Sequence, residues 1–308
     1  MLRIMNNSTQ SIRGSMPAMV TPLTPHGRVD HDAQRRIIQF FLDSGIHGTV
    51  VLGSTGEMQG PDWDQRSAAI ATVVEAVNGQ VPVIAGAGLP NLKATIDQIK
   101  EAAGVGADAA LVVPPYYFPI GQDAIVAWFD RLVSESPIPV MYYHFPDMTK
   151  LSADPDTVVR LRDVGVAGMK DSGGSTTYLH EVLFRVREDE GFPVMLGSDG
   201  HLIDALLNGA DGCIGLPQNV VPHLSVDMFN AFRDGDLETA HRLQRTAADF
   251  LVKLMLSLPG QAAAKAALEK MGLCTRKMAP PLTELTNEEA DSLWERLKSY
   301  CRVPTGSV

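Results

Sequence analysis

The sequence predicts an α/β fold of the (β/α)8 TIM-barrel type, followed by a C-terminal helical extension. Two observations lead to this prediction. Eight short apolar runs, each bounded by Gly, Pro or polar residues, have the character of strands buried on both faces of a parallel sheet. Between them lie longer segments in which apolar residues recur every three or four positions, which is typical of helices that bury one face.

The first candidate strand follows a polar N-terminal segment. In chain order the runs are Met16–Thr21, Gly48–Leu52, Val83–Ala87, Ala109–Val113, Val140–His144, Val166–Lys170, Val194–Gly197 and Gly212–Leu216. Helices such as Asp32–Ser44 and Ser67–Val77 connect them, and Gly45 is placed to end the first of these helices. A doubly wound open sheet is the alternative, but no G-x-G-x-x-G motif follows the first strand.

The chain beyond Asp234 has no further strand-like runs. Helical patterns take their place at Asp236–Ser257, Gln261–Met271 and Asn287–Cys301. The last of them opens with the capping-box pattern from Thr286 to Glu289. We therefore expect a loose tail at 1–13, the barrel at 14–234 and a helical extension at 235–308.

The composition excludes several classes of protein. The 308 residues carry a net charge of −10 and no long basic run, which argues against nucleic acid or an anionic membrane as a partner. No apolar run reaches the roughly 18 residues of a membrane span, and the N-terminal segment lacks the apolar core of a secretory signal. The three cysteines show no C-x-x-C spacing, so a disulfide framework or zinc site is not indicated. A cytoplasmic location fits best.

The most unusual stretch is Val166–Gly174, which reads V-A-G-M-K-D-S-G-G. Its apolar run ends in Lys170 and then breaks into a loop of small residues. Lysine is seldom buried without a partner. Burial can lower a lysine pKa from about 10.4 to about 7–8, and the free amine can then form a Schiff base with a ketone. The alternative is a lysine that leaves the strand and is simply solvated.

Other candidate residues follow the remaining strands, where a barrel carries its active site. After the second strand, Gly53–Glu57 reads G-S-T-G-E, and its hydroxyls and backbone N–H groups are suited to hold a carboxylate. The other interpretation is a tight turn that caps the next helix. After the seventh strand, Asp199 is placed to accept hydrogen bonds from substrate hydroxyls, or else to cap the short helix that follows.

Tyrosines mark the ends of the fourth and fifth strands, in P-P-Y-Y at Pro114–Tyr117 and Y-Y-H-F-P at Tyr142–Pro146. A phenol beside a neutral amine can pass protons. Tyrosines at strand ends more often only pack, with one hydrogen bond from the hydroxyl.

The order of these motifs carries more information than any one of them. G-S-T-G-E, P-P-Y-Y, Y-x-x-P and a lysine at the end of an apolar strand occur in a succession that resembles the dihydrodipicolinate synthase and N-acetylneuraminate lyase superfamily of class I, Schiff-base aldolases. The segment A-M-V-T-P-L at Ala18–Leu23 belongs to the resemblance, which runs from about Met16 to the C-terminal helices.

The resemblance implies roles for individual residues. Lys170 corresponds to the Schiff-base lysine and Tyr143 to the catalytic phenol. Ser54 and Thr55 correspond to the residues that bind the carboxylate of a pyruvate-type 2-oxo acid, and the Ser54 hydroxyl also enters the proton relay.

Two further positions follow from the same resemblance. Tyr117 matches the tyrosine that enters the relay from an adjacent subunit, which implies a homo-oligomer, either a dimer or a tetramer. Ile214 matches a residue that lines the pyruvate pocket.

Departures from the family pattern bear on the second substrate. Met148 stands where dihydrodipicolinate synthases have an arginine that holds a carboxylate, and a thioether cannot replace it. Gly200 stands where sialic acid lyases have an acidic residue, and His144 stands where an asparagine is usual. With Ser172 and Asp199 also expected at the mouth, Met148 favours a neutral or hydroxylated aldehyde.

The expected function is therefore that of a lyase that cleaves or forms a C–C bond between pyruvate and an aldehyde, in a 2-keto-3-deoxy sugar acid or a related 2-oxo acid. The alternatives are a 4-hydroxy-tetrahydrodipicolinate synthase of lysine biosynthesis, a dehydratase of 2-keto-3-deoxy acids, and a non-catalytic pyruvate-binding barrel. No cofactor is expected beyond the covalent imine on Lys170. No metal ion is expected either, because the acidic and histidine side chains near the strand ends lack the spacing of a ligand set.

Overall fold

The computed structural model describes residues 12–60, 62–186, 191–256 and 258–303. Its strands form one parallel sheet in the order β1-β8-β7-β6-β5-β4-β3-β2. The strands are β1 (Gly14–Pro17), β2 (Thr49–Val51), β3 (Val83–Ala87), β4 (Ala109–Val112), β5 (Val140–His144), β6 (Met169–Asp171), β7 (Val194–Leu196) and β8 (Gly212–Gly215).

The sheet closes between β1 and β2. Just beyond β1, Ala18 forms a parallel bridge with Val50, and the Met19 N–H donates to the Val50 carbonyl at 2.9 Å. The first and last strands of the sheet are thus joined, which confirms the barrel and excludes the open doubly wound sheet.

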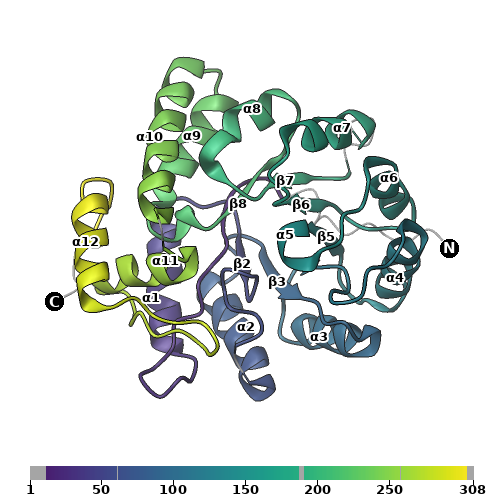
Figure 1. Cartoon of the computed structure of the whole chain (residues 1–308), viewed down its shortest axis with the longest axis horizontal. Coiled ribbons are helices and arrows are strands. Elements are labelled where there is room, and N and C mark those ends of the chain that lie inside the picture. The colour runs from purple at the N-terminus through teal and green to yellow at the C-terminus, as the bar shows by residue number, and fades with distance from the viewer. Residues whose placement is uncertain (1–11, 61, 187–190, 257, 304–308) are drawn as a thin grey trace.

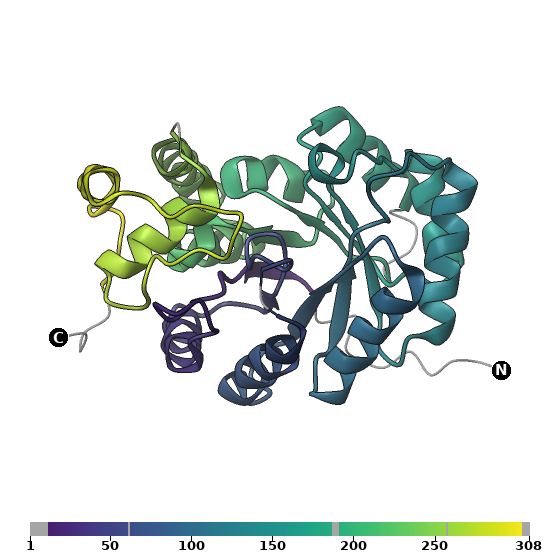
Figure 2. The same ribbon diagram turned by 60° about the horizontal axis from the view of Figure 1, so that its bottom comes forward.

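Helices surround the strands (Figures 1 and 2). They are α1 (His31–Asp43), α2 (Trp63–Val77), α3 (Leu92–Gly104), α4 (Gln122–Glu135), α5 (Pro146–Thr149), α6 (Pro155–Asp163), α7 (Thr176–Val186), α8 (Leu202–Leu207) and α9 (Pro222–Arg233). Short 3-10 turns, η2 (Asp199–His201) and η3 (Pro217–Asn219), follow β7 and β8.

Strand alternation divides the buried residues into two layers. Met16, Val50, Met141, Tyr143 and Ile214 belong to the cluster inside the barrel. Their neighbours along the strands face outward and pack against the surrounding helices. Because every strand is covered on both faces, the strands read as continuous apolar runs in the sequence.

Most predicted strands agree with the observed ones to within one residue at each end, and two differ by more for local reasons. The first run was expected at Met16–Thr21, but the regular strand ends at Pro17. Beyond it, backbone groups bond to the Asn219 side chain instead of to a neighbouring strand. This side chain accepts from the Val20 N–H at 2.9 Å and donates to the Ala18 carbonyl at 2.7 Å. In the sixth run, Gly168 takes φ +150°, so the extended strand begins only at Met169 and continues past Lys170 to Asp171.

The N-terminal prediction is tested only in its last residues. Most of the tail expected at 1–13 lies outside the described residues. Ile12 is buried in the barrel interior and Arg13 pairs with Asp211 at 3.2 Å, so these two residues are part of the barrel rather than of a loose tail.

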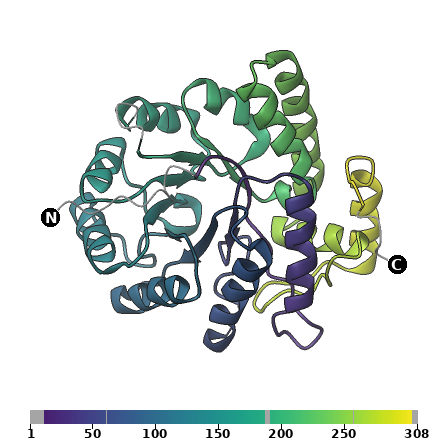
Figure 3. The same ribbon diagram turned by 180° about the vertical axis from the view of Figure 1, so that it is seen from behind.

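The helical extension consists of α10 (Leu237–Met255), α11 (Gly260–Lys270) and α12 (Asn287–Leu297). The capping box of Thr286 and Glu289 is present at the start of α12. Helix α10 packs on α9 and η2, and the extension lies on the same side of the barrel as α1 (Figure 3). None of the described helices is long and apolar enough to cross a membrane.

Asn219 provides a test of how the barrel closes. Replacing it with alanine leaves the Val20 N–H and the Ala18 carbonyl buried without partners, so the free energy of unfolding should fall by about 2 kcal/mol or more. Urea denaturation measures this change. The exposed Asn208, which bonds only within its own helix end, is the matched control, and Asn208→Ala should change the stability by less than about 1 kcal/mol. Equal effects of the two substitutions would contradict this role of Asn219.

Candidate active site

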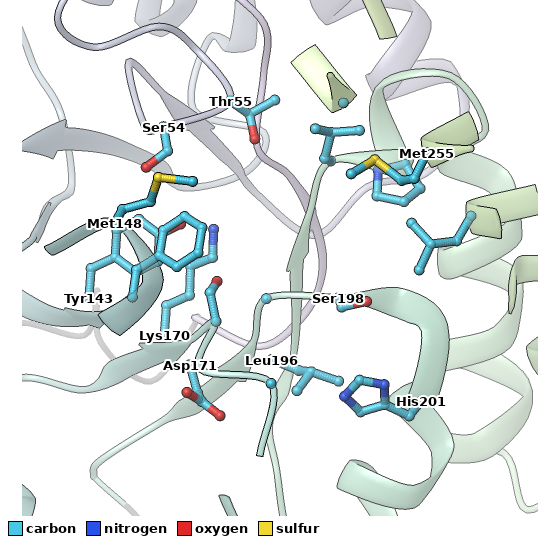
Figure 4. Close-up of a pocket in the computed structure, with 18 of the residues that line it drawn as sticks. Ser54, Thr55, Tyr143, Met148, Lys170, Asp171, Leu196, Ser198, His201 and Met255 are labelled. Carbon is cyan, nitrogen blue, oxygen red and sulfur yellow. The ribbon is translucent and has the colours of Figure 1, made fainter. Parts of the chain in front are cut away.

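A cavity of about 550 Å³ opens at the C-terminal ends of the strands. Figure 4 shows side chains from several strand ends turned toward it. Ser54 and Thr55 come from the loop after β2, Tyr143 from β5 and Lys170 from β6, and the extension contributes Met255 from α10. This is the end of the barrel at which TIM-barrel enzymes carry their active sites.

Lys170 lies in the barrel wall with its amine at the floor of the cavity. It pairs in register with Tyr143 of the neighbouring strand, so both side chains point to the inner face of the barrel. Its exposed fraction is 5%, and its Nζ atom lies 4.4 Å from the centroid of the Tyr143 ring. The alternative of a solvated lysine therefore does not hold.

The Tyr143 phenol shares the cavity with the side chains of Ser172, Ser54 and Lys170. Burial by itself raises the pKa of Tyr143. The positive charge of Lys170 and the polar groups of Ser172 and Ser54 outweigh burial, so the pKa lies below the ordinary value of 10.0. A phenol with a lowered pKa beside an amine is suited to give and take protons.

The loop Gly53–Glu57 forms a turn that does not cap a helix, because α2 begins only at Trp63. Its hydroxyls line the cavity instead. Leu52, which precedes the loop, and Glu57, its last residue, both take φ +54°. The Gly56 carbonyl accepts a hydrogen bond from the Thr21 hydroxyl at 2.6 Å. Such positive φ angles persist only where the surroundings hold them.

A buried ion pair holds the end of this turn. The Glu57 carboxylate pairs with the Lys265 ammonium of α11 and also accepts the Ala279 N–H at 2.7 Å. Lys265 donates in addition to the Lys277 carbonyl at 2.6 Å. Burial lowers the pKa of Lys265, while the Glu57 charge opposes that shift. The extension thus fixes the turn that carries Ser54 and Thr55.

Asp199 is not where the sequence analysis expected it. Its carboxylate is buried beneath the cavity, accepts from the Ser225 hydroxyl and from the Cys213 thiol, and does not line the cavity wall. Burial raises the pKa of Asp199. The side chain turns inward because Gly215 has no Cβ, which would lie 2.0 Å from the carboxylate. Its neighbours Ser198 and His201 line the cavity in its place.

The other expected residues are distributed as follows. Ser172 and Met148 line the cavity, and Met148 is 66% exposed at its mouth. Ile214 is fully buried in the barrel interior and is not part of the wall. Tyr117 is 84% exposed, takes φ +90° and packs edge-on against Phe118, outside the cavity of its own chain.

A second cavity of about 340 Å³ lies next to the first and shares Ser54, Phe145 and Met148 with it. Tyr116 and Leu282 line its other sides. Gln261 also lines both cavities, so the two adjoin along the loop after β2, the end of β5 and the start of α11.

Sequence reasoning missed the contribution of the extension. Leu251, Met255 and Gln261 line the cavity, and no motif marks them, because helix packing between distant segments brings them there. Within the described ranges, no cluster of three or more His, Cys, Asp or Glu side chains is arranged to hold a metal ion.

His144 and Asp171 form a pair on the outer face of the barrel, directly behind Tyr143 and Lys170. The His144 Nε2 and Asp171 Oδ1 atoms lie 3.9 Å apart, and both side chains are almost fully buried. Burial lowers the pKa of His144 to about 4 and raises the pKa of Asp171 to about 6. The imidazole is thus neutral in the folded protein near neutral pH.

A barrel whose mouth holds a buried lysine beside a phenol and a hydroxyl-bearing turn has the architecture of a Schiff-base-forming lyase. Comparison with known proteins agrees. The chain belongs to the dihydrodipicolinate synthetase family, whose family model matches residues 11–300.

Individual relatives are similar over most of their length. The chain is 36% identical to 4-hydroxy-tetrahydrodipicolinate synthase of Hyphomonas neptunium, over 88% of this chain and 92% of the relative. It is 30% identical to YjhH of Escherichia coli, named "Probable 2-dehydro-3-deoxy-D-pentonate aldolase", over 91% and 94% of the two chains. The solved structure of YagE from E. coli K12 in complex with pyruvate superposes with a TM-score of 0.89 at 28% identity, covering 94% of this chain and 98% of YagE.

The Glu57–Lys265 pair predicts a large effect of one substitution. Lys265→Met leaves the Glu57 carboxylate buried without its counter-charge and should lower the free energy of unfolding by about 3–5 kcal/mol. Adding Glu57→Gln should recover part of that loss. Lys253→Met, which breaks the partly exposed pair with Asp249, should have a much smaller effect in the same denaturation experiment. A Lys265→Met protein as stable as the wild type would show that the pair does not hold the turn.

The lowered pKa of His144 predicts a dependence of stability on pH. The unfolded imidazole titrates near 6.5 and the folded one near 4, so unfolding takes up a proton between these values and stability falls as the pH drops from 6.5 to 4. A glutamine side chain takes up no proton in this pH range. Between pH 7 and pH 5, the wild type should therefore lose about 2 kcal/mol more than His144→Gln, as measured by urea unfolding at each pH. Parallel pH profiles would contradict a neutral, buried His144.

Proposed function

We propose that the Lys170 amine forms a Schiff base with the keto carbon of pyruvate or a larger 2-oxo acid. On this basis the protein cleaves or forms the C–C bond between pyruvate and an uncharged aldehyde. The observation that carries the proposal is the buried amine 4.4 Å from the Tyr143 ring, in the same cavity as Ser54 and Thr55. The pyruvate complex of YagE, a structural relative, supports the choice of pyruvate.

The reaction begins when the free amine attacks C2 of the keto acid. The carbonyl oxygen takes up two protons, one released by the attacking amine and one that Tyr143 is placed to supply, and leaves as water to give the protonated imine. Ser54 and Thr55 hold the carboxylate with their hydroxyls and neighbouring N–H groups. No cofactor is required for this step, because the iminium itself accepts the electron pair.

Bond cleavage then separates C3 from C4. The bonding electrons move into the iminium and form an enamine, while the proton of the C4 hydroxyl passes to Tyr143 and the aldehyde leaves. Protonation of the enamine at C3 and hydrolysis of the imine release pyruvate and the free lysine. Synthesis is the same sequence in reverse.

The wall of the cavity supports an uncharged aldehyde. Among the residues that the structure describes, Lys170 is the only lysine or arginine in the wall. The wall also carries the hydroxyls of Ser175, Thr176 and Ser198 and the imidazole of His201, together with the apolar Met148 and Met255. Asp171, Ser172 and Gln261 are further polar residues of the lining, and the carboxylate of Asp171 adds no positive charge that would hold a second carboxylate. Hydroxyl-bearing aldehydes of the 2-keto-3-deoxy sugar acid type fit this lining.

The names of the relatives support two candidate reactions. A 4-hydroxy-tetrahydrodipicolinate synthase is favoured by the relative at 36% identity, and an aldolase of 2-keto-3-deoxy acids by the relative YjhH. Met148 favours the second, because a carboxylate on the aldehyde would meet a thioether. Dehydration of a 2-keto-3-deoxy acid would use the same imine.

The proposal includes a homo-oligomer, a dimer or a tetramer, in the cytoplasm. Tyr117 and Phe118 form an exposed aromatic pair, and the second cavity lies against Ser54 and Met148. A Tyr117 side chain from a second copy that entered this cavity would reach the wall of the active site. The free cysteines Cys213, Cys274 and Cys301 suit a reducing compartment.

Imine trapping tests the central step. Incubation with pyruvate and borohydride should add the mass of one reduced pyruvate to the protein, as measured by mass spectrometry. Lys170→Ala should abolish the adduct. Replacing the exposed Lys93 with alanine should leave it unchanged. A wild-type protein that forms no adduct would instead be a non-catalytic pyruvate-binding barrel or use other chemistry.

Met148 tests the second substrate. Met148→Arg places a cation at the mouth and should raise kcat/KM at least about tenfold for condensation of pyruvate with an aldehyde that carries a carboxylate, such as aspartate semialdehyde. Steady-state kinetics with this aldehyde and with glyceraldehyde as the uncharged control measure the change. If both aldehydes respond equally, Met148 does not contact the aldehyde.

A further inference from the structure

We propose that His144 is a positioning residue for the acid–base phenol. Its imidazole, stacked on Tyr178, supports the turn Asp171–Gly174 so that the Ser172 hydroxyl meets Tyr143. The catalytic role of Tyr143 in this inference rests on the proposed function, whereas the packing of His144 does not.

The imidazole is held from two sides on the outer face of the barrel. Its ring stacks on the Tyr178 ring of α7, with centroids 4.4 Å apart and an interplanar angle of 18°. Its Nδ1 atom lies 3.1 Å from the Tyr142 hydroxyl and 3.2 Å from the Tyr178 hydroxyl. A single ring therefore ties β5 to the helix that follows β6.

The hydrogen bonds fix which ring nitrogen carries the proton. The Tyr178 hydroxyl donates to the Ala153 carbonyl at 2.8 Å, and the Tyr142 oxygen accepts the Ala153 N–H at 3.3 Å. The Tyr142 proton is then left to donate to Nδ1 of His144. Nδ1 is thus the acceptor, and the N–H of the ring is on Nε2, facing Asp171.

Burial keeps this ring neutral although a carboxylate faces it. Tyr142, Tyr178 and Asp171 face it, and Asp154 acts on Tyr178 from the start of α6. Burial is the cause of the lowered pKa of His144. The imidazole therefore acts through its shape and its N–H group rather than through a positive charge.

The edge of the ring that carries Nε2 forms the wall behind Gly173. A Cβ on Gly173 would lie 2.8 Å from Nε2 and 2.9 Å from the adjacent carbon, closer than real Cβ atoms come. The Asp171 carboxylate faces Nε2 and accepts the Gly173 N–H at 2.9 Å. His144, Asp171 and Gly173 thus fit together as one packed unit.

Ser172 transmits this packing to the active site. Its N–H donates to the His144 carbonyl at 2.8 Å, and its side chain lines the same cavity as the Tyr143 phenol, whose pKa the hydroxyl lowers. The hydroxyl occupies the space that a Cβ on Gly197 would need, since that Cβ would lie 2.0 Å from Ser172 Oγ. A shift of the turn would therefore move the hydroxyl relative to Tyr143.

The experiment measures the ionisation of Tyr143 directly. The tyrosinate absorbance of each variant is titrated with pH, and the same titration with Tyr143→Phe added is subtracted, so that the difference belongs to Tyr143. Ser172→Ala removes a hydroxyl that lowers the pKa of Tyr143 and should therefore raise this pKa by roughly one unit. Thermal unfolding of each variant reports separately on stability.

Two substitutions of His144 distinguish the contribution of Nε2 from that of Nδ1. Glutamine places an N–H where Nε2 stands, whereas asparagine replaces only the Nδ1 side. We expect His144→Gln to retain the Tyr143 pKa and His144→Asn to raise it as far as Ser172→Ala does. The double variant His144→Asn with Ser172→Ala should show no further rise, because both substitutions act through the position of the Ser172 hydroxyl.

A glycine substitution provides an independent route if a His144 variant fails to fold. Gly173→Ala should push against Nε2 and raise the Tyr143 pKa, whereas Gly104→Ala, which has open space around it, should not. An unchanged Tyr143 pKa in His144→Asn or Gly173→Ala, or additive shifts in the double variant, would overturn the inference. Failure of imine trapping in the wild type would instead overturn the proposed function and leave this titration valid.

Discussion

The site depends on the register between β5 and β6. Because Tyr143 pairs with Lys170, both side chains enter the barrel, and the next pair, His144 and Asp171, faces the helices. A slip of one residue would bury the carboxylate against the phenol and turn the amine outward. The same alternation therefore places the amine and the phenol on the inner face of two short strands and the His144–Asp171 pair on their outer face.

Strand alternation also explains how much of the molecule could be predicted from the sequence. The runs Val83–Ala87 and Val140–His144 coincide with β3 and β5, because their residues are buried on both faces. The approach of Lys170 to Tyr143 followed from the resemblance and from the rule that barrel sites lie at strand ends. Both predictions rest on patterns that lie within one strand or that recur at every strand of the barrel.

The features that were missed depend on packing between distant segments. The inward turn of Asp199 is decided by the missing Cβ of Gly215 on the next strand, which the G-S-D-G pattern alone cannot reveal. Met255 reaches the cavity only because α10 packs on η2. For His144, the sequence showed an unusual residue at its position, but its partner Tyr178 lies on a different element and carries no motif.

The ion pair between Glu57 and Lys265 has a consequence for biosynthesis of the chain. The carboxylate belongs to the second βα unit, whereas its counter-charge is translated more than two hundred residues later. Until α11 has left the ribosome, the nascent barrel holds an acidic side chain whose native environment does not yet exist, and water or a proton must satisfy it. The turn that carries Ser54 and Thr55 can therefore acquire its native support only after α11 has been synthesised.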